Sequence, residues 1–474
     1  MGNPKGFMEV AKKDGGYRPV EERIEDFSEV EQTLNDEDRK LQASRCMDCG
    51  VPFCHWACTV ASKIPEWQDA LYRGNYKEAY EILTESNAFP EFTGRICPAL
   101  CEKSCVLNIH NESVTIRENE CSVAEKAFAL GYVVPKPPKV RTGKKVAVIG
   151  SGPAGLSAAE RLNAWGHSVT VFEKDDAIGG LLRYGIPDFK LSKKVIDRRL
   201  EVLVDEGIEF KTNTNVGVDI TGEQLLKEYD AVVLAIGAMK PRDLPVEGRD
   251  LEGIHYAMDF LKQQNKVNRG QKYAAKERIL AESKNVLVIG GGDTGSDCVG
   301  TSIRQKAKAV RQIEIMPKPP TKRAFGNPWP YWPNVIKTSS SHEEGCEREW
   351  ALATKRFIGE NGKVKQAEVV TVEWRKNADG RMEMVEITGS NKIIDCDLVL
   401  LSMGFVHCVH EGLVNELGLE LDGRGNIKVN DSRQSISNDK VFASGDAAMG
   451  ASLVVRAIED ARQMAAKVHQ FLNV

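Results

Sequence analysis

The feature that most constrains the fold of this chain is a strand–glycine–helix motif that occurs twice. The first copy, VAVIGSGPAG, ends at Gly155, and the second, VLVIGGGDTG, ends at Gly295. Each copy joins a Val- and Ile-rich run, typical of a buried parallel strand, to glycines spaced G-x-G-x-x-G. Such glycines permit a tight turn and a close approach of backbone N–H groups to a pyrophosphate at a helix N-terminus. The sequence therefore predicts two doubly wound α/β nucleotide-binding domains.

The domain organisation follows from the runs around these motifs. With 474 residues, the chain exceeds the size that one hydrophobic core usually serves. Strand-like and helix-like runs alternate after a Pro- and Lys-rich hinge, KPPKVRTGKK, whereas EWQDALYRGNYKEAYEILTES before it has helical periodicity. We expect a helical domain at 1–142, a discontinuous nucleotide-binding domain at 143–247 and 406–474, and a second one at 248–405. The stretch PKPPTKRAFGNPWPYWPN should be an ordered excursion without helix or strand.

Composition and charge exclude several functions. The formal net charge is −4 and Lys and Arg form no blocks, so we expect no nucleic-acid partner. No window offers the ~18 consecutive apolar residues that a membrane span needs, and the start, MGNPKGFMEVAKKDGG, lacks the apolar core of a secretory signal. We therefore expect a soluble, cytoplasmic protein in a reducing compartment, where cysteines are rarely paired as disulfides.

The first glycine motif is predicted to bind FAD. Glu173 ends the next strand, at the spacing expected for a hydrogen bond to a ribose hydroxyl. FAD is favoured over a nicotinamide nucleotide by GGLLRYGIP, by DAVVLAIGA and by a last strand-to-helix turn, SGDAAMG, whose N–H dipoles and carboxylate suit a ribityl chain. The residues assigned to FAD on these grounds are Gly150, Ser151, Gly152, Pro153, Ala154, Gly155, Glu173, Lys174, Gly180, Gly237, Gly445 and Asp446.

The second glycine motif is expected to bind a nicotinamide nucleotide, because the flavin occupies the first. The following strand ends at Glu314, with Arg311 and Lys318 nearby; an acid there favours NADH and a base favours NADPH, so the rule gives a split answer. We take NADPH as the expectation and NADH as the alternative. Because no C-x-x-C lies in this domain, a thioredoxin-reductase-like dithiol is excluded. The residues assigned to this nucleotide are Gly290, Gly291, Gly292, Asp293, Thr294 and Arg311.

Eight of the twelve cysteines lie between Cys46 and Cys121, in turns marked by Pro and Gly. They include one run spaced C-x2-C-x4-C-x3-C and one spaced C-x3-C-x3-C. Seven thiols in two runs suit two 4Fe-4S clusters, since each iron needs a terminal ligand. Structural zinc is the competing interpretation, but it prefers two C-x2-C pairs or mixtures of Cys and His. Seven thiols leave two clusters one ligand short, and the spacing alone offers Cys121 as the eighth.

Taken together, RCMDCGVPFCH, FPEFTGRICPALCEKSCVL, VIGSGPAG, GGLLRYGIP, GGGDTGSDC, NPWPYWP and ASGDAA resemble the small (β) subunit family of glutamate synthase. The related N-terminal module of dihydropyrimidine dehydrogenase shares the cysteine segment and the tandem nucleotide domains. The resemblance implies one cluster on Cys46, Cys49, Cys54 and Cys105, and another on Cys58, Cys97, Cys101 and Glu120, with Cys121 as the alternative to Glu120. It also implies that Leu181, Lys190 and Val216 touch the flavin.

The function implied by this resemblance is electron delivery. NAD(P)H would reduce FAD, and the two 4Fe-4S clusters would pass single electrons to the FMN of a large subunit that makes glutamate from glutamine and 2-oxoglutarate. Hydride transfer needs no side-chain acid or base, so no catalytic residue is expected. The alternatives are a ferredoxin:NADP oxidoreductase or a bifurcating flavoprotein subunit of the same architecture. A zinc-stabilised scaffold with vestigial nucleotide folds is an alternative from another class.

Overall fold

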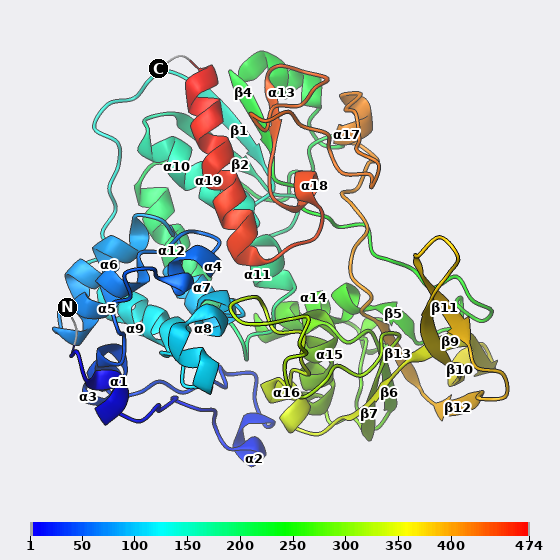
Figure 1. Ribbon diagram of the computed structural model, residues 1–474. Coiled ribbons are helices and arrows are strands. Elements are labelled where there is room, and N and C mark those ends of the chain that lie inside the picture. The colour runs from blue at the N-terminus through cyan, green and yellow to red at the C-terminus, as the bar shows by residue number, and fades with distance from the viewer. Residues whose placement is uncertain (1–2, 473–474) are drawn as a thin grey trace.

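The computed structural model describes residues 3–472, which form one helical part and two parts built on parallel sheets (Figure 1). The helical part, coloured blue to cyan in Figure 1, packs against both of the others. Its helices are α1 (Gly6–Glu9), α2 (Val20–Arg23), α3 (Asp36–Ser44), α4 (Phe53–Ala57), α5 (Ile64–Tyr72), α6 (Tyr76–Thr84), α7 (Pro90–Ile96), α8 (Leu100–Ser104), η1 (Val106–His110) and α9 (Ile116–Ala129).

The predicted helical segment EWQDALYRGNYKEAYEILTES forms two helices, α5 and α6. Gly74 takes a φ of +78° between them, and the Asn75 side chain accepts a hydrogen bond from the Glu78 N–H to cap α6. Trp67 is fully buried in the core that these helices share, where its indole N–H donates to Ser62 Oγ at 3.1 Å. This small core supports the cysteine-bearing loops.

The first parallel sheet has the order β14-β4-β1-β2-β3. Its strands are β1 (Lys145–Ile149), β2 (Ser168–Phe172), β3 (Glu209–Lys211), β4 (Ala231–Leu234) and β14 (Val441–Ala443). Helices α10 (Pro153–Ala164) and α19 (Val454–Phe471) cover one face, and α13 (Gly222–Glu228) covers the other. The strand β14 and the helices α18 (Asp446–Met449) and α19 return to this sheet after the chain has built the second one, so the part is discontinuous.

The second parallel sheet has the order β5-β13-β6-β7-β8. Its strands are β5 (Ile254–Tyr256), β6 (Asn285–Ile289), β7 (Ala309–Glu314), β8 (Glu347–Trp350) and β13 (Leu398–Leu401). Helices α14 (Ala257–Asn268) and α15 (Asp293–Arg304) cover one face. Both sheets are thus parallel with the predicted strand–glycine–helix start, which confirms the α/β fold class.

The other face of the second sheet is covered by an antiparallel sheet that the sequence analysis did not anticipate. Its strands are β9 (Leu352–Glu360), β10 (Lys363–Lys376), β11 (Met382–Glu386) and β12 (Lys392–Asp395). The alternation of buried and exposed residues along β10 is interrupted by two shifts of register, so the period-two pattern is broken. The bulged strand therefore gives a weaker signal than a regular one would.

The remaining elements connect these layers. They are α11 (Gly180–Tyr184), α12 (Lys193–Asp205), η2 (Ala275–Glu277), α16 (Ser340–Glu343) and α17 (Leu413–Glu416). The Pro- and Trp-rich stretch at 317–334 contains turns and bends without helix or strand, as predicted.

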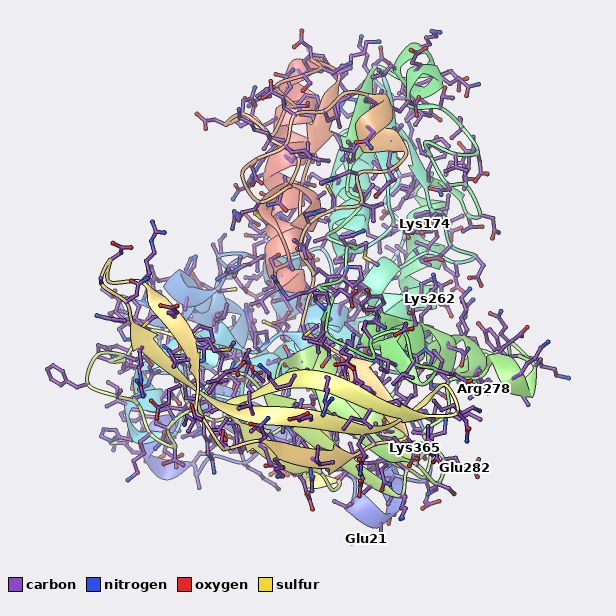
Figure 2. The ribbon with its side chains drawn as sticks, turned by 90° about the vertical axis from the view of Figure 1, so that its right-hand side faces the viewer. Glu21, Lys174, Lys262, Arg278, Glu282 and Lys365 are labelled. Atoms are coloured by element: carbon purple, nitrogen blue, oxygen red, sulfur yellow. The ribbon has the colours of Figure 1, made fainter. Side chains whose placement is uncertain are left out.

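Ion pairs cross the junctions between the three parts. Arg199 of α12 forms a buried pair with Glu91 of α7 at 2.6 Å, which joins the first sheet's part to the helical part. Lys262 of α14 pairs with Asp175 at 2.5 Å and joins the two sheet-containing parts. Figure 2 shows Lys262 and the exposed Lys174 close to this second junction.

Candidate functional site

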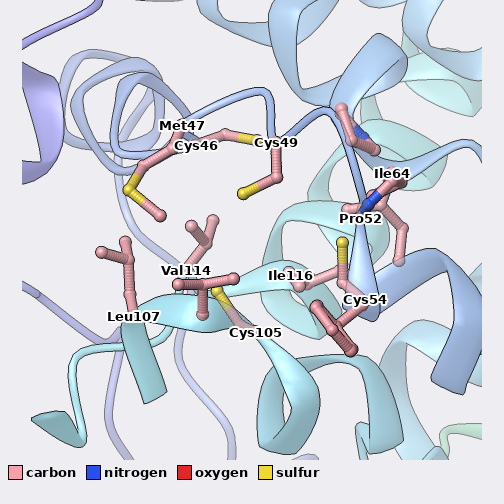
Figure 3. A pocket seen from close by; sticks show the side chains of 13 residues that line it. Cys46, Met47, Cys49, Pro52, Cys54, Ile64, Cys105, Leu107, Val114 and Ile116 are labelled. Atoms are coloured by element: carbon pink, nitrogen blue, oxygen red, sulfur yellow. The ribbon is translucent and has the colours of Figure 1, made fainter. Parts of the chain in front are cut away.

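Four cysteines line one pocket in the helical part (Figure 3). Cys46 and Cys49 lie in the loop after α3, Cys54 lies in α4, and Cys105 lies between α8 and η1. Apolar side chains including Ile64, Leu107, Val114 and Ile116 complete the wall. Burial raises the pKa of Cys46 to about 12 and raises the pKa of Cys54 further above its ordinary value. The four thiols are the set that the family resemblance implied for one cluster.

Three further cysteines and Glu120 form a second group. The charge of Glu120 interacts electrostatically with both Cys58 and Cys97. Cys101 in turn interacts with Cys58, Cys97 and Glu120. Burial raises the pKa of Glu120 to about 7, opposed by hydrogen bonds from Thr93 Oγ1 and from Asn87 Nδ2, the latter at 3.1 Å. The four members of this second group are those that the family resemblance implied for the other cluster, namely Cys58, Cys97, Cys101 and Glu120.

Cys121 lies away from this group, although it follows Glu120 directly. Successive residues of an α-helix point about 100° apart, so neighbours on α9 face different surroundings. The charges that act on Cys121 are those of Arg95, Glu125, Glu31 and Arg117, and none of the other cysteines is among its main influences. The placement supports Glu120 as the eighth ligand.

The prediction that all eight cysteines between Cys46 and Cys121 lie in turns is wrong for three of them, because Cys54, Cys101 and Cys121 lie in the helices α4, α8 and α9. Across residues 3–472, no three His, Cys, Asp or Glu side chains surround one point closely enough to hold a single metal ion. A four-iron cluster requires a different arrangement, because each thiolate binds its own iron.

The first glycine turn has the form that a pyrophosphate requires. Gly150 takes a φ of +98°, and a Cβ on Gly155 would lie 1.9 Å from the Gly150 carbonyl oxygen. A Cβ on Gly152 would meet nothing within 4 Å, so the backbone is open where α10 begins at Pro153. The first N–H groups of α10, including that of Ala154, have no side-chain cap and remain available to an anion.

Glu173 directly follows β2, beside this turn. Its Oε2 accepts hydrogen bonds from the Ser151 N–H at 3.1 Å and from Ser151 Oγ at 2.5 Å. The Gly179 N–H donates to Ser151 Oγ at 3.0 Å, which holds Gly180 and the start of α11 against the turn. The adjacent Lys174 is exposed. The acid thus lies where the ribose next to the pyrophosphate would be.

Two further turns open at the same sheet edge. Gly237 follows β4, which pairs parallel with β1, and Gly445 follows β14, which pairs parallel with β4. The turns therefore meet at the carboxyl ends of the strands. The Gly445 N–H donates to Asp460 at 2.7 Å, and Asp446 accepts from Ser452 Oγ at 2.7 Å. Burial raises the pKa of Asp446.

The three residues that only the resemblance implied lie around the same edge. Leu181 is in α11, directly after Gly180, which lies against the first glycine turn. Val216 is buried in the loop after β3. Lys190 follows α11, and its ammonium group donates to Asp297 of α15 at 2.9 Å. Lys190 therefore crosses the junction to the second sheet.

The second glycine turn repeats the first. Gly290 takes a φ of +122°, with the Ser402 carbonyl oxygen 2.4 Å from where a Cβ would be, and α15 begins at Asp293 without a side-chain cap. Gly291, Gly292 and Thr294 complete this open helix start.

Arg311 lies elsewhere. Side chains alternate across a strand, so Arg311 and Glu314 of β7 point to opposite faces of the sheet. The Arg311 guanidinium contacts Glu347 and forms an ion pair with Glu349 at 3.4 Å. It is thus held by two acids of β8 on the face away from the glycine turn.

Two family models match the chain. One, described as dihydropyrimidine dehydrogenase domain II, 4Fe-4S cluster, matches residues 23–132, and one described as pyridine nucleotide-disulphide oxidoreductase matches residues 144–461. The glutamate synthase (NADPH) small chain of Mycobacterium tuberculosis is 47% identical, over 100% of this chain and 96% of that one. The Bacillus subtilis small chain is 44% identical, over 100% and 99%. The chain belongs to the glutamate synthase small-chain family.

The family also has relatives in longer proteins. The glutamate synthase (NADH) of Saccharomyces cerevisiae is 44% identical over 99% of this chain, which spans 22% of that protein. Among solved structures, Mycobacterium tuberculosis FprA in complex with NADPH matches 71% of this chain and 85% of its own, with a TM-score of 0.55 and 18% identity, and so shares the fold. The predicted class of enzyme, an oxidoreductase with FAD, 4Fe-4S and nicotinamide nucleotide sites, is confirmed by the family.

Sequence reasoning gave no role to the Pro- and Trp-rich stretch of this family member. Trp329 lies 4.7 Å from Phe53, ring to ring, and its indole N–H donates to the Cys105 carbonyl oxygen at 3.2 Å. Ser104 Oγ donates to the Pro330 carbonyl oxygen at 2.7 Å. The stretch therefore packs against Phe53 and Cys105, two residues of the wall of the first cysteine pocket. Its density of Trp and Pro was the available signal.

No helix among residues 3–472 is long and apolar enough to cross a bilayer.

Proposed function

We propose that this chain is the small subunit of a glutamate synthase. It oxidises NAD(P)H at FAD and passes electrons through two 4Fe-4S clusters to the FMN of a large subunit, which forms glutamate from glutamine and 2-oxoglutarate. The observation that carries the proposal is the correspondence with small chains over the whole length, together with two cysteine groups packed beside two nucleotide folds.

The turns at the edge of the first sheet fit FAD. The open backbone at Gly152 would admit the pyrophosphate, and Glu173 would take the adenosine ribose. Asp446 and the N–H groups of α18 would face the ribityl chain. A flavin held there supplies hydride acceptance and one-electron release. The residues bind and orient the reactants, so no general acid or base is assigned.

The two cysteine groups fit four-iron clusters. The first group would hold one cluster through four thiolates, and the second would hold the other through three thiolates and the Glu120 carboxylate. Cys58 and Cys97 pack against the core that includes β1, α10 and α19. This contact with the proposed flavin-binding fold supports an order in which electrons from the flavin reach the second group before the first.

The partner and the compartment are part of the same proposal. The names of the relatives, a small chain in bacteria and one part of a longer protein in yeast, support a large subunit as the partner. Thiol ligands are stable in a reducing compartment, so we place the protein in the cytoplasm.

The test is analysis of protein prepared without oxygen. The expected content is one FAD and about eight iron atoms per chain, with flavin absorbance that bleaches on addition of NAD(P)H. The chain should co-elute from its native source with a large subunit that bears FMN and forms glutamate. A flavin-containing sample that holds no iron or sulfide contradicts the electron path. A small ferredoxin-type partner in place of the large subunit indicates the ferredoxin:NADP oxidoreductase alternative.

A further inference from the structure

We propose that the large subunit binds beside the first cysteine group, on an exposed aromatic patch whose bordering cations attract carboxylates of the partner. The aromatic patch consists of Val51, Trp56, Phe325 and Tyr331. The inference rests on the proposed function, because it assigns the surface at which electrons leave the same enzyme.

The aromatic patch adjoins the group from which the electrons would leave. Trp56 is in α4, two residues after Cys54 of the pocket in Figure 3, and Val51 lies two residues before Phe53 of the pocket wall. The Tyr331 ring lies 6.2 Å from the Trp56 ring, edge to face. Because the second group packs against the proposed flavin-binding fold, the first group is the later one on the electron path. A protein that takes electrons from the first group has to bind close to it.

The side chains of the patch are large, apolar and open to water. The exposed fraction is 70% for Val51, 63% for Trp56 and 57% for Tyr331, and Phe325 is fully exposed. Single exposed apolar residues are common on protein surfaces, but neighbouring aromatic side chains that share one face mark a site of interaction with another protein. Tyr, Trp and Phe are also the residue types enriched at the centres of such interfaces.

The part of the patch contributed by residues 317–334 is held in one conformation by hydrogen bonds. Residues 324–327 form a turn closed by an N–H···O bond of 2.9 Å, with Phe325 at its corner. The Arg323 guanidinium donates to the Tyr331 carbonyl oxygen at 2.6 Å. A surface that is ordered before binding loses less conformational entropy when the partner binds.

Four cations border the patch, namely Lys103, Lys322, Arg323 and Lys337. Arg323 also donates to the Lys103 carbonyl oxygen at 3.4 Å, and Lys337 Nζ lies 4.1 Å from the centre of the Trp332 ring. Within residues 3–472, none of the four forms an ion pair with a carboxylate. The whole chain has a net charge of −4, so this positive border is a local feature.

The charges decide which kind of occupant fits the patch. Cations without acidic partners attract a protein face rich in carboxylates and speed its association. A symmetric contact between two copies of this chain would instead place the four cations opposite one another, which is unfavourable. The large subunit of the proposed function is therefore assigned as the occupant, with carboxylates around the apolar centre of its binding face.

The first experiment measures binding of the purified large subunit to the oxygen-free holoprotein by calorimetry, at low and at high salt. Added salt should weaken binding by the unaltered protein, because it screens the bordering charges. Trp56→Ala and Tyr331→Ala should each weaken binding at least about tenfold, as expected for central aromatic residues of an interface. The double variant Lys322→Glu, Lys337→Glu should weaken binding about tenfold at low salt and less at high salt.

Two matched variants serve as controls. Tyr132→Ala removes an exposed aromatic ring in the loop after α9, and Lys227→Glu reverses an exposed charge of α13; both should leave the affinity unchanged. Iron content and flavin bleaching by NAD(P)H are measured in every variant, because Trp56 lies between Cys54 and Cys58. Unchanged affinity in Tyr331→Ala and in the double charge variant overturns the proposal, and so does an equal loss of affinity in the controls.

The second experiment measures glutamate formation as the small subunit is added to a fixed amount of large subunit. The patch variants should bleach their flavin at the ordinary rate but require at least about tenfold more protein for half-maximal glutamate formation. Glutamate formation at the ordinary protein concentration contradicts this inference and leaves the proposed function intact. Failure of the unaltered protein to bind the large subunit contradicts the proposed function, and the occupant assigned to the patch is then wrong as well.

Discussion

The two cysteine groups use the same residue type in different surroundings. The first consists of four thiols in a pocket of the helical part's own core, and Trp329 of the second sheet's part contacts Phe53 and Cys105 in its wall. The second has three thiols and Glu120, and Cys58 and Cys97 pack against the core of the first sheet. The difference teaches that each group packs against a different nucleotide-binding fold, so the two groups should respond separately to changes in those folds.

The largest expected effect comes from removing one thiol of each group. Cys54→Ser and Cys101→Ser should each lower the iron content from about eight to about four atoms per flavin, because a cluster that loses a ligand is not retained. In both variants the reduction of a dye by NAD(P)H at the flavin should persist while glutamate formation with the large subunit is lost. Full loss of iron from either single variant would show that the two groups are not independent.

A smaller effect should separate Glu120 from Cys121. Glu120→Ala removes the only proposed oxygen ligand, and the second cluster should then be lost at least about tenfold faster in air, as followed by visible absorbance. Cys121→Ser is the matched control, since Cys121 faces Arg95 and Glu125 and should leave the rate unchanged. The reverse pattern would identify Cys121 as the eighth ligand.

Trp329→Ala should act on the first group alone. It removes the ring contact with Phe53 and the hydrogen bond to the Cys105 carbonyl, at a cost of about 2 kcal/mol for a half-buried aromatic. The first cluster should therefore bleach several-fold faster in air than the second. Trp332→Ala, in which the lost ring contact is with Lys337, provides the comparison and should bleach at the ordinary rate.

The smallest effect is a pH dependence of α19, the helix beside the second group. Burial, and then the charge of His469, lower the pKa of His167 to about 4, and the two rings are hydrogen-bonded at 2.9 Å. Between pH 6.5 and 4 the unfolded chain binds a proton at His167 that the native chain does not. The contribution of neutral His167 to the free energy of unfolding is therefore complete above about pH 6.5 and is lost as the pH falls towards 4. The Tm should fall over this range, and His167→Gln should flatten the slope. An equal slope of Tm against pH in the variant and the unaltered protein would show that His167 does not cause the dependence.

Local patterns in the sequence predicted the parts of the site that depend on neighbouring residues. The turns at Gly150 and Gly290 and the acids at Glu173 and Glu314 follow from spacing, because strand, turn and helix are adjacent in the chain. The family motifs implied both cysteine groups, and the structure brings the members of each together.

The remainder depends on contacts between distant residues or on interrupted patterns. Lys190 and Asp297 are 107 positions apart, and no spacing rule links them. The antiparallel sheet was missed because register shifts break the alternation along β10. The two-residue period of β7 determines the face of the sheet on which Arg311 lies. Applying that period requires the bounds of the strand, which come from the structure.

The contact between Ser104 and Pro330 joins residues 226 positions apart. A ribosome makes the chain from its N-terminus, so the cysteines of the first pocket are synthesised long before the segment that packs against the pocket wall. During that interval the Phe53 ring and the Cys105 carbonyl of the pocket wall lack their contacts with Trp329. The wall of the first pocket therefore gains its last packing contacts only after the chain has been synthesised beyond residue 330.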